Sequence, residues 1–99
     1  MPQRYKITFA VSAVRDLENI RKWYMQQDVP DVGIRLLREV ISQVERLEDF
    51  PESGRIVPEF GLDRLREIIH PPFRIVYRLE NHRVRIVRIW RSERQLKMR

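Results

Sequence analysis

Arginine is the most abundant side chain with binding chemistry in this sequence of 99 residues. Of the 20 basic residues 17 are arginines, and the planar guanidinium group binds a phosphate or a carboxylate through two parallel hydrogen bonds. Up to Asp63 the chain has 9 basic and 11 acidic residues, whereas the remainder has 11 basic and 3 acidic ones. The formal charge of +6 thus divides into −2 and +8. The last third of the chain is expected to bind an anionic partner, either nucleic acid or an acidic protein.

Several of these arginines are spaced so that they share one face of a sheet. Side chains alternate between the two faces along a strand. If Leu65 and Ile69 face a layer of helices, the uncovered face gathers His70 and a set of arginines, with two more just beyond the last strand. The set expected to bind phosphate groups or a target is Arg66, Arg74, Arg78, Arg91 and Arg94. Mutual repulsion among these charges favours an anionic partner that relieves it.

Groups for covalent or metal chemistry are scarce. The absence of cysteine excludes disulfides, thiolate catalysis and cysteine-based zinc sites. His70 and His82 are the only imidazoles, and Glu52, Glu59 and Glu67 are dispersed without an evident carboxylate pair. We therefore expect no metal and no cofactor. Histidine suits proton transfer, so His70 is the acid–base candidate, although the two prolines that follow it equally favour a turn.

The elements that position these residues are predicted from apolar spacing. Residues 5–9 alternate with period two, which is typical of a strand. A first helix, capped by Ser12, carries apolar residues at helical spacing and ends near Gln27. After a turn over 28–31, with Asp31 or its neighbour as the cap, a second helix carries the stripe Ile34, Leu37, Val40, Ile41, Val44 and Leu47. Pro51 and Gly54 end that helix.

The rest of the chain predicts a loop and three strands. Residues 55–61 are expected to form the loop, and the strands are expected at 65–70, 73–79 and 83–90. Asn81 is expected to take the positive φ of a tight hairpin. The apolar phase changes at Ile86 and Val87, so either a bulge lies there or both faces are partly covered.

This order of elements predicts an α+β fold. In the order β-α-α-β-β-β, a helical hairpin packs on one face of a largely antiparallel sheet, giving two layers. The length and the 42% hydrophobic residues suit one domain over 1–99. No apolar run approaches the roughly 20 residues that span a bilayer, and the first residues lack the apolar stretch of a signal peptide. We expect a cytoplasmic protein without membrane contact.

Short motifs in a fixed order carry a resemblance to a known family. They are Asp16–Ile20 (DLENI), Phe50–Arg55 (FPESGR) followed by Pro58–Glu59, Leu65–Glu67 (LRE), Phe73–Arg78 (FRIVYR) and Arg88–Arg94 (RIWRSER). Together they resemble the RelE/ParE superfamily of toxins from type II toxin–antitoxin systems, and are closer to its ParE-like branch. The resemblance covers nearly the whole chain.

The resemblance implies a small toxin held inactive by a cognate antitoxin. Such an antitoxin has an acidic, partly disordered C-terminal segment that wraps the toxin, and it alone carries the contact with operator DNA. The basic last third of the chain fits this partner. The residues expected to contact it are Trp23, Arg83, Arg85, Arg88 and Trp90.

Two activities occur in the superfamily, and the resemblance alone does not choose between them. ParE-like members inhibit DNA gyrase and block replication, whereas RelE-like members cut mRNA on the ribosome without a metal. A ribonuclease would use Arg66, His70, Arg74 and Arg94. This chain has no tyrosine after Tyr77 and no histidine after His82, so a terminal acid–base residue is missing. We favour the gyrase inhibitor, without enzymatic activity; a non-toxic member that only binds its antitoxin is a further alternative.

Overall fold

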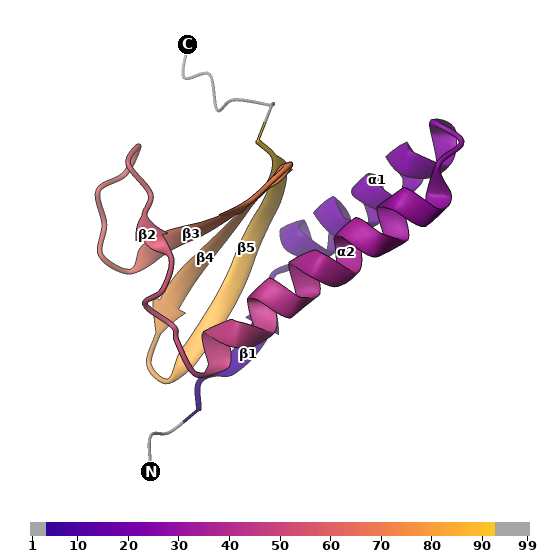
Figure 1. Cartoon of the computed structure of the whole chain (residues 1–99). Coiled ribbons are helices and arrows are strands. Elements are labelled where there is room, and N and C mark those ends of the chain that lie inside the picture. The colour runs from indigo at the N-terminus through magenta and orange to yellow at the C-terminus, as the bar shows by residue number, and fades with distance from the viewer. Residues whose placement is uncertain (1–3, 93–99) are drawn as a thin grey trace.

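Two helices cover one face of a five-stranded sheet in the computed structural model of the chain, which describes residues 4–92 (Figure 1). The elements follow the expected order. They are β1 (Lys6–Phe9), α1 (Val11–Gln26), α2 (Pro30–Glu45), a 3₁₀ turn (Arg46–Glu48), β2 (Arg55–Ile56), β3 (Leu65–His70), β4 (Phe73–Glu80) and β5 (Arg83–Arg91). The strand order is β1-β5-β4-β3-β2. The α+β, two-layer fold with a helical hairpin on one face is confirmed.

The sheet is largely antiparallel, as expected, but one parallel pair makes it mixed. β1 runs parallel to β5, with Ile7 opposite Val84, while the other neighbouring strands are antiparallel. No tight turn joins the first strand to the last, so their direction is not set by a hairpin. The expected loop over 55–61 also contains the two-residue strand β2, whose Arg55 lies opposite Glu67 of β3.

The helix caps differ from those predicted. Ala10, not Ser12, is the N-cap of α1, and the Ser12 hydroxyl instead donates a 2.7 Å hydrogen bond to the carbonyl of Val87. α2 begins with Pro30, which needs no partner for an amide hydrogen, so Asp31 lies in the first turn rather than at the cap. The two helices approach closely at Gly33, because glycine has no side chain. A Cβ at this position would lie only 2.7 Å from the Cβ of Tyr24.

The β4–β5 hairpin places one expected feature and moves another. Val76 lies opposite Arg88 and Tyr77 opposite Ile86, so Val87 is an extra residue in β5 and the predicted bulge is confirmed. The positive φ belongs to His82, at 54°, and not to Asn81. Asn and His both tolerate this conformation, so composition alone does not choose between neighbours.

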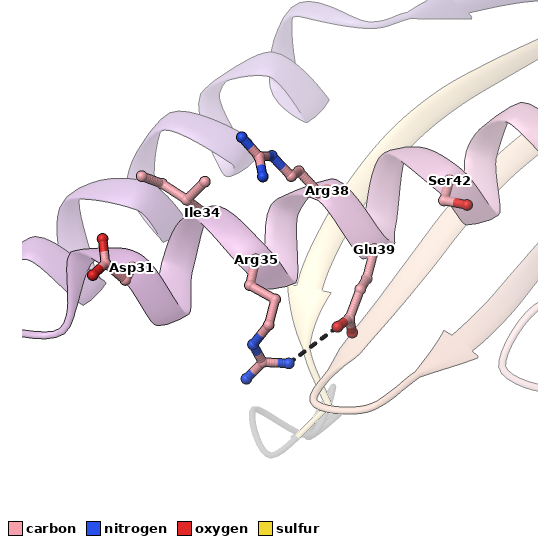
Figure 2. A pocket seen from close by; sticks show the side chains of 6 residues that line it. All are labelled: Asp31, Ile34, Arg35, Arg38, Glu39 and Ser42. Carbon is pink, nitrogen blue, oxygen red and sulfur yellow. Dashed lines mark hydrogen bonds and ion pairs between the residues drawn. The ribbon is translucent and has the colours of Figure 1, made fainter.

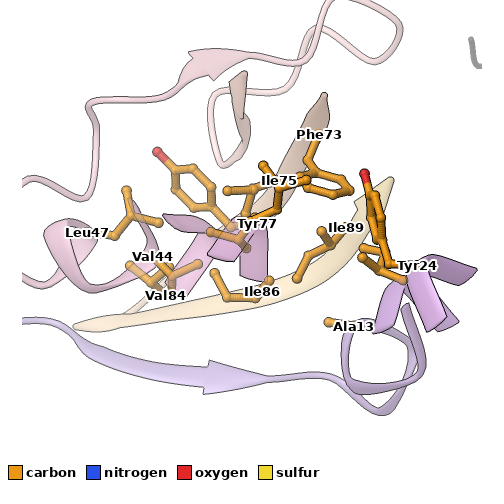
Figure 3. Packing of buried hydrophobic residues seen from close by; sticks show 13 residues of the cluster. Ala13, Tyr24, Val44, Leu47, Phe73, Ile75, Tyr77, Val84, Ile86 and Ile89 are labelled. Carbon is orange, nitrogen blue, oxygen red and sulfur yellow. The ribbon is translucent and has the colours of Figure 1, made fainter. Parts of the chain in front are cut away.

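The core lies between the helices and the sheet (Figure 3). β4 contributes Phe73, Ile75 and Tyr77, which pack with apolar side chains of both helices, the 3₁₀ turn and β5. Among these are Ala13 and Tyr24 of α1, Val44 of α2, Leu47 of the 3₁₀ turn, and Val84, Ile86 and Ile89 of β5. Burial of these aromatic and branched side chains is the main stabilising term of the fold.

The face assigned to β3 from the sequence was wrong. Arg66 lies opposite Tyr77 and His70 lies opposite Phe73, and opposed residues share a face. Arg66 and His70 are thus on the helix side of the sheet, together with Ile68, which packs against the core. Because β3 has apolar residues in both phases, its alternation alone does not define the buried face.

A buried phenol holds the segment between α2 and β2 in place. The Tyr77 hydroxyl donates to the carbonyl of Pro51 at 2.7 Å and accepts from the amide of Gly54 at 2.9 Å. A Cβ on Gly54 would lie 2.6 Å from that hydroxyl oxygen. The FPESGR motif therefore turns so tightly against the core that its glycine has no room for a side chain.

Tyr77→Phe is expected to lower the free energy of unfolding by about 1–3 kcal/mol, because two polar groups of the turn lose their partner. Urea unfolding measures this. Tyr5→Phe is the matched control, since the Tyr5 hydroxyl makes no hydrogen bond within residues 4–92, and its change should stay within about 0.5 kcal/mol. Equal losses in the two variants would contradict the role of Tyr77.

Alkaline pH is expected to destabilise the protein through the same residue. Burial raises the pKa of Tyr77 above the ordinary tyrosine value. A raised pKa means that the folded chain prefers the protonated phenol, so this contribution is complete below about pH 10 and is lost as pH rises further. The difference in unfolding free energy between the parent chain and Tyr77→Phe should shrink across that range. If the difference stays constant as pH rises, the proposed effect of Tyr77 ionisation on stability is wrong.

Candidate functional site

The sheet face that points away from the helices gathers most of the predicted binding residues. In the β4–β5 pair, Arg74 lies opposite Trp90 and Arg78 lies opposite Arg85. Residues opposed in this way share a face. We call this the open face, and its basic and aromatic members are Arg74, Arg78, Arg83, Arg85, Arg88 and Trp90. Residues expected to contact the target and residues expected to contact the antitoxin are thus brought together.

A buried ion network lies at one end of the open face. Glu67 is only 1% exposed, and its carboxylate accepts hydrogen bonds of 2.7 Å from Nε of Arg55 and from Nε of Arg74. The other nitrogens of Arg74 reach the carboxylate of Glu59 at 3.3 and 3.4 Å. Two arginines and two glutamates therefore neutralise one another and join β2, β3, β4 and the loop between β2 and β3.

The charges of the network depend on one another. A hydrogen bond from its own backbone lowers the pKa of Glu59, and the hydrogen bond from Arg74 lowers it further. Burial opposes the charge of Arg74, yet its pKa is raised because Glu67 and Glu59 accept its hydrogen bonds. Removing one member would leave a buried charge without a full set of partners. Arg74 is therefore a structural residue first.

Glu59 and Glu67 correct the expectation of dispersed carboxylates. They are eight positions apart in the sequence but meet at one guanidinium group. A signal for the network was present, since its members all belong to motifs: Arg55 to FPESGR, Glu59 to the following pair, Glu67 to LRE and Arg74 to FRIVYR. Spacing along the chain did not show that these motifs converge.

The exposed arginines lie further along the open face. The Arg78 side chain is 45% exposed and pairs with Glu80 at 3.0 Å, while Arg85 lies directly opposite it. Among residues 4–92, Arg83 and Arg85 have no ion-pair partner. Like charges opposed across strands destabilise a sheet. Arg78, Arg83 and Arg85 therefore form a cationic surface that an anion stabilises.

Asp16 joins α1 to the edge of β5 beyond the end of β1. One of its carboxylate oxygens accepts from the amide of Ile89 at 2.8 Å, and both accept from Arg88, at 2.8 and 3.0 Å. The Arg88 guanidinium lies 4.7 Å from the centre of the Trp90 ring. Two side chains of α1, Ser12 and Asp16, thus replace the missing neighbouring strand, which gives the DLENI motif a structural role.

Other predicted site residues lie away from the open face. Arg66 donates to the carbonyls of Asp63, Glu52 and Gly54 at 2.9 to 3.2 Å. Nε2 of His70 lies 2.9 Å from a carboxylate oxygen of Glu39 in α2, and this contact is the largest cause of the lowered pKa of Glu39. Neither side chain meets Arg74, so the structure does not assemble the set Arg66, His70 and Arg74.

Arg91 connects the end of β5 with α1. Its guanidinium donates to the Tyr24 hydroxyl at 2.8 Å and lies 4.3 Å from the centre of the Trp23 ring. Arg91 lies opposite Phe73 and therefore on the helix side of the sheet. Trp23 is thus separated from the open-face residues with which it was grouped. Arg94 lies outside the described residues.

The open face offers the chemistry of anion binding. Its guanidinium groups offer forked donors for phosphate or carboxylate oxygens, whereas the strands that form it contain no histidine, cysteine or tyrosine on this face within residues 4–92. No group of three or more metal-ligating side chains occurs in that range. None of the helices described there has the length and apolarity to cross a membrane.

A model of one protein family matches most of the chain. The family model for the ParE toxin of type II toxin–antitoxin systems, parDE, matches residues 7–96. No curated protein is a significant match.

Solved structures that share the fold come from several bacteria. The chromosomal ParDE toxin–antitoxin system from P. aeruginosa has a chain with TM-score 0.75 and 21% identity, over 89% of this chain and 96% of that one. A chain of the RelBE2 toxin–antitoxin complex from Mycobacterium tuberculosis gives 0.66 and 21%, over 89% and 98%. A conserved hypothetical protein from Helicobacter pylori gives 0.59 and 18%, over 90% and 96%.

Arg74→Ala is expected to lower the free energy of unfolding by about 3 kcal/mol or more, because buried Glu67 keeps only Arg55 as a partner. Arg78→Ala is the matched control on the same strand. It removes an exposed ion pair, so its cost should be within about 1 kcal/mol. Urea unfolding of both variants makes the comparison. Small and equal losses would contradict the structural role of Arg74.

Proposed function

This chain belongs to the ParE family of toxins of type II toxin–antitoxin systems, and we propose that its target is DNA gyrase in the cytoplasm. Binding would trap gyrase on cleaved DNA and block replication. The observation that carries the proposal is the family match over residues 7–96, together with an open face whose described strand residues offer cations but no histidine, cysteine or tyrosine. The toxin then acts by binding rather than by catalysis.

The position of His70 supports gyrase inhibition over RNA cleavage. A ribonuclease needs a group that moves a proton beside the residues that hold the phosphate. His70 is engaged by Glu39 on the helix side of the sheet, whereas Arg78 and Arg85 lie on the opposite face. Arg66 and Arg74, the other members of the ribonuclease set, bind carbonyls and carboxylates of this chain.

We assign the target contact to Arg78 of the open face; Arg91 lies on the helix side of the sheet and does not share this surface. Arg66 and Arg74 then contribute by holding the sheet and its loop, not by touching the target. The assignment rests on exposure: the side chain of Arg78 is 45% exposed, and that of Arg74 only 10%. An exposed guanidinium can exchange its intramolecular partner for a target carboxylate or phosphate at little cost.

The same open face suits an antitoxin with an acidic segment. Arg83 and Arg85 lack ion-pair partners within residues 4–92, and they continue toward Arg88 and Trp90. Two of the structures with this fold are described as toxin–antitoxin assemblies. An acidic chain laid across these arginines would cover Arg78 as well. Neutralisation then results from competition for one surface, and Trp23 adds a separate contact on α1.

Purified toxin is expected to inhibit supercoiling of relaxed plasmid by gyrase and to increase the cleaved fraction. Reversing two charges, Arg78→Glu with Arg85→Glu, should raise the toxin concentration for half inhibition at least tenfold, since cations that meet the target become anions. Arg15→Glu with Lys22→Glu on α1 changes the net charge equally, and this control should inhibit like the parent chain.

Two results would contradict the proposal. One is normal supercoiling at every toxin concentration. The other is cleavage of mRNA on ribosomes by the same preparation, which would assign the chain to the ribonuclease activity of the superfamily.

A further inference from the structure

A hollow at one end of the sheet combines apolar and cationic walls. It measures about 580 Å³ and lies where β3 begins and β4 ends. Leu65 of β3 lies opposite Arg78 of β4, so the two side chains share the open face. Leu62, in the loop before β3, is 47% exposed. We call this site the hairpin hollow, and its lining includes Leu62, Arg64, Leu65, Arg78, Leu79 and Glu80.

Backbone hydrogen bonds fix the walls of the hairpin hollow. The amide of Leu65 donates to the carbonyl of Leu62 at 3.0 Å, which turns the loop back toward β3. The amide of Leu79 donates to the carbonyl of Arg64 at 2.7 Å, which ties the same loop to the end of β4. A site with a fixed backbone loses less conformational entropy when a partner binds. The hollow is therefore preorganised for a ligand.

The charges of the hairpin hollow leave one cation without a partner. Arg78 pairs with Glu80 at 3.0 Å, whereas Arg64 has no ion-pair partner within residues 4–92. Two arginines and one glutamate among the described lining residues leave an excess of one positive charge. The hollow therefore suits a single carboxylate beside an apolar group.

A second hollow, beside α2, differs in this respect (Figure 2). Its described lining has two basic and two acidic side chains, and Arg35 pairs with Glu39 at 3.0 Å. Glu39 also lies 2.9 Å from Nε2 of His70. The charges of that hollow balance, so it offers no net charge to a partner.

We propose that the hairpin hollow binds a polypeptide segment of gyrase that carries an aliphatic side chain and a carboxylate on the same side. The aliphatic group would contact Leu62 and Leu65, and the carboxylate would pair with Arg64 and Arg78. Residues four apart on a helix have Cβ atoms about 5–6 Å apart, which is close to the roughly 4.8 Å between neighbouring strands. The inference rests on the proposed function and adds the chemistry of the target segment.

A polypeptide fits this hollow better than the backbone of DNA does. A duplex presents rows of phosphates, and its apolar groups lie within the grooves. Phosphates laid on the hollow would leave Leu62 and Leu65 without an apolar partner and would bring further negative charge toward Glu80. An aliphatic side chain instead removes leucine surface from water. The leucines therefore favour the protein of the gyrase–DNA complex as the ligand.

The hairpin hollow also separates the target from the antitoxin. It lies on the β3 side of Arg78, whereas Arg83 and Arg85, which we assign to the antitoxin, belong to β5 on the other side. The two partners then overlap at Arg78, and the leucines serve the target alone. A change to a leucine of the hollow should weaken the contact with gyrase and leave the binding of acidic chains intact.

Gyrase supercoiling assays with Leu62→Ser test the inference, because this change leaves every charge in place. The toxin concentration for half inhibition should rise at least about fivefold, since the apolar contact is lost. Leu62→Ile keeps the apolar volume and should inhibit within about twofold of the parent chain. Val14→Ser on α1 is the matched control, because Val14 is 43% exposed, and it should inhibit like the parent chain.

Arg64→Gln gives a second measure that does not depend on the leucines. It should raise the concentration for half inhibition about threefold or more, because the carboxylate of the target loses one partner. Direct binding completes the test. Immobilised parent chain should retain gyrase without DNA, and Leu62→Ser should retain less. Both chains should bind an oligoglutamate peptide, the probe for acidic segments, equally well and should have the same urea unfolding midpoint.

Three results would overturn the inference. If the parent chain inhibits gyrase and Leu62→Ser inhibits equally, the hairpin hollow is not the contact, while the proposed function stands. If the parent chain never inhibits, the proposed function is contradicted and the inference falls with it. If the parent chain binds a short DNA duplex without gyrase, and binds gyrase only when DNA is present, the ligand of the open face is DNA rather than a polypeptide.

Discussion

The buried carboxylate of Glu67 is the constraint on which the sheet and its open face depend. A carboxylate removed from water needs compensating charge and hydrogen bonds, and Glu67 obtains them from Arg55 and Arg74. Arg74 in turn holds Glu59. These contacts draw β2 and the following loop onto the edge and outer surface of β3 and β4. The turn that leads into β2 is fixed from the other side by Tyr77.

This network divides the arginines into those that build the fold and those that remain for a partner. Arg55, Arg66, Arg74 and Arg88 bind carbonyls or carboxylates of the chain itself. Arg83 and Arg85, with the exposed Arg78 beside them, form the cationic part of the open face. The sheet therefore offers a surface for an anion.

Much of the fold could be predicted from the sequence because its signals are local. The stripe from Ile34 to Leu47 predicted α2, and the phase change at Ile86 and Val87 predicted the bulge. The face of β3 could not be predicted in this way, because Leu65, Ile68 and Ile69 offer apolar residues in both phases. The direction of β1 is set by pairing with the last strand of the chain. The ion network, too, joins residues that only the tertiary fold brings together.

The central claim is that Glu67 and Arg74 form one coupled structural unit. A double-mutant cycle in urea unfolding, with Glu67→Gln, Arg74→Gln and the double variant, measures their coupling free energy directly. We predict a coupling of at least about 1.5 kcal/mol, because each single variant leaves a buried charge that the double variant does not. Additive losses, with a coupling near zero, would contradict the account.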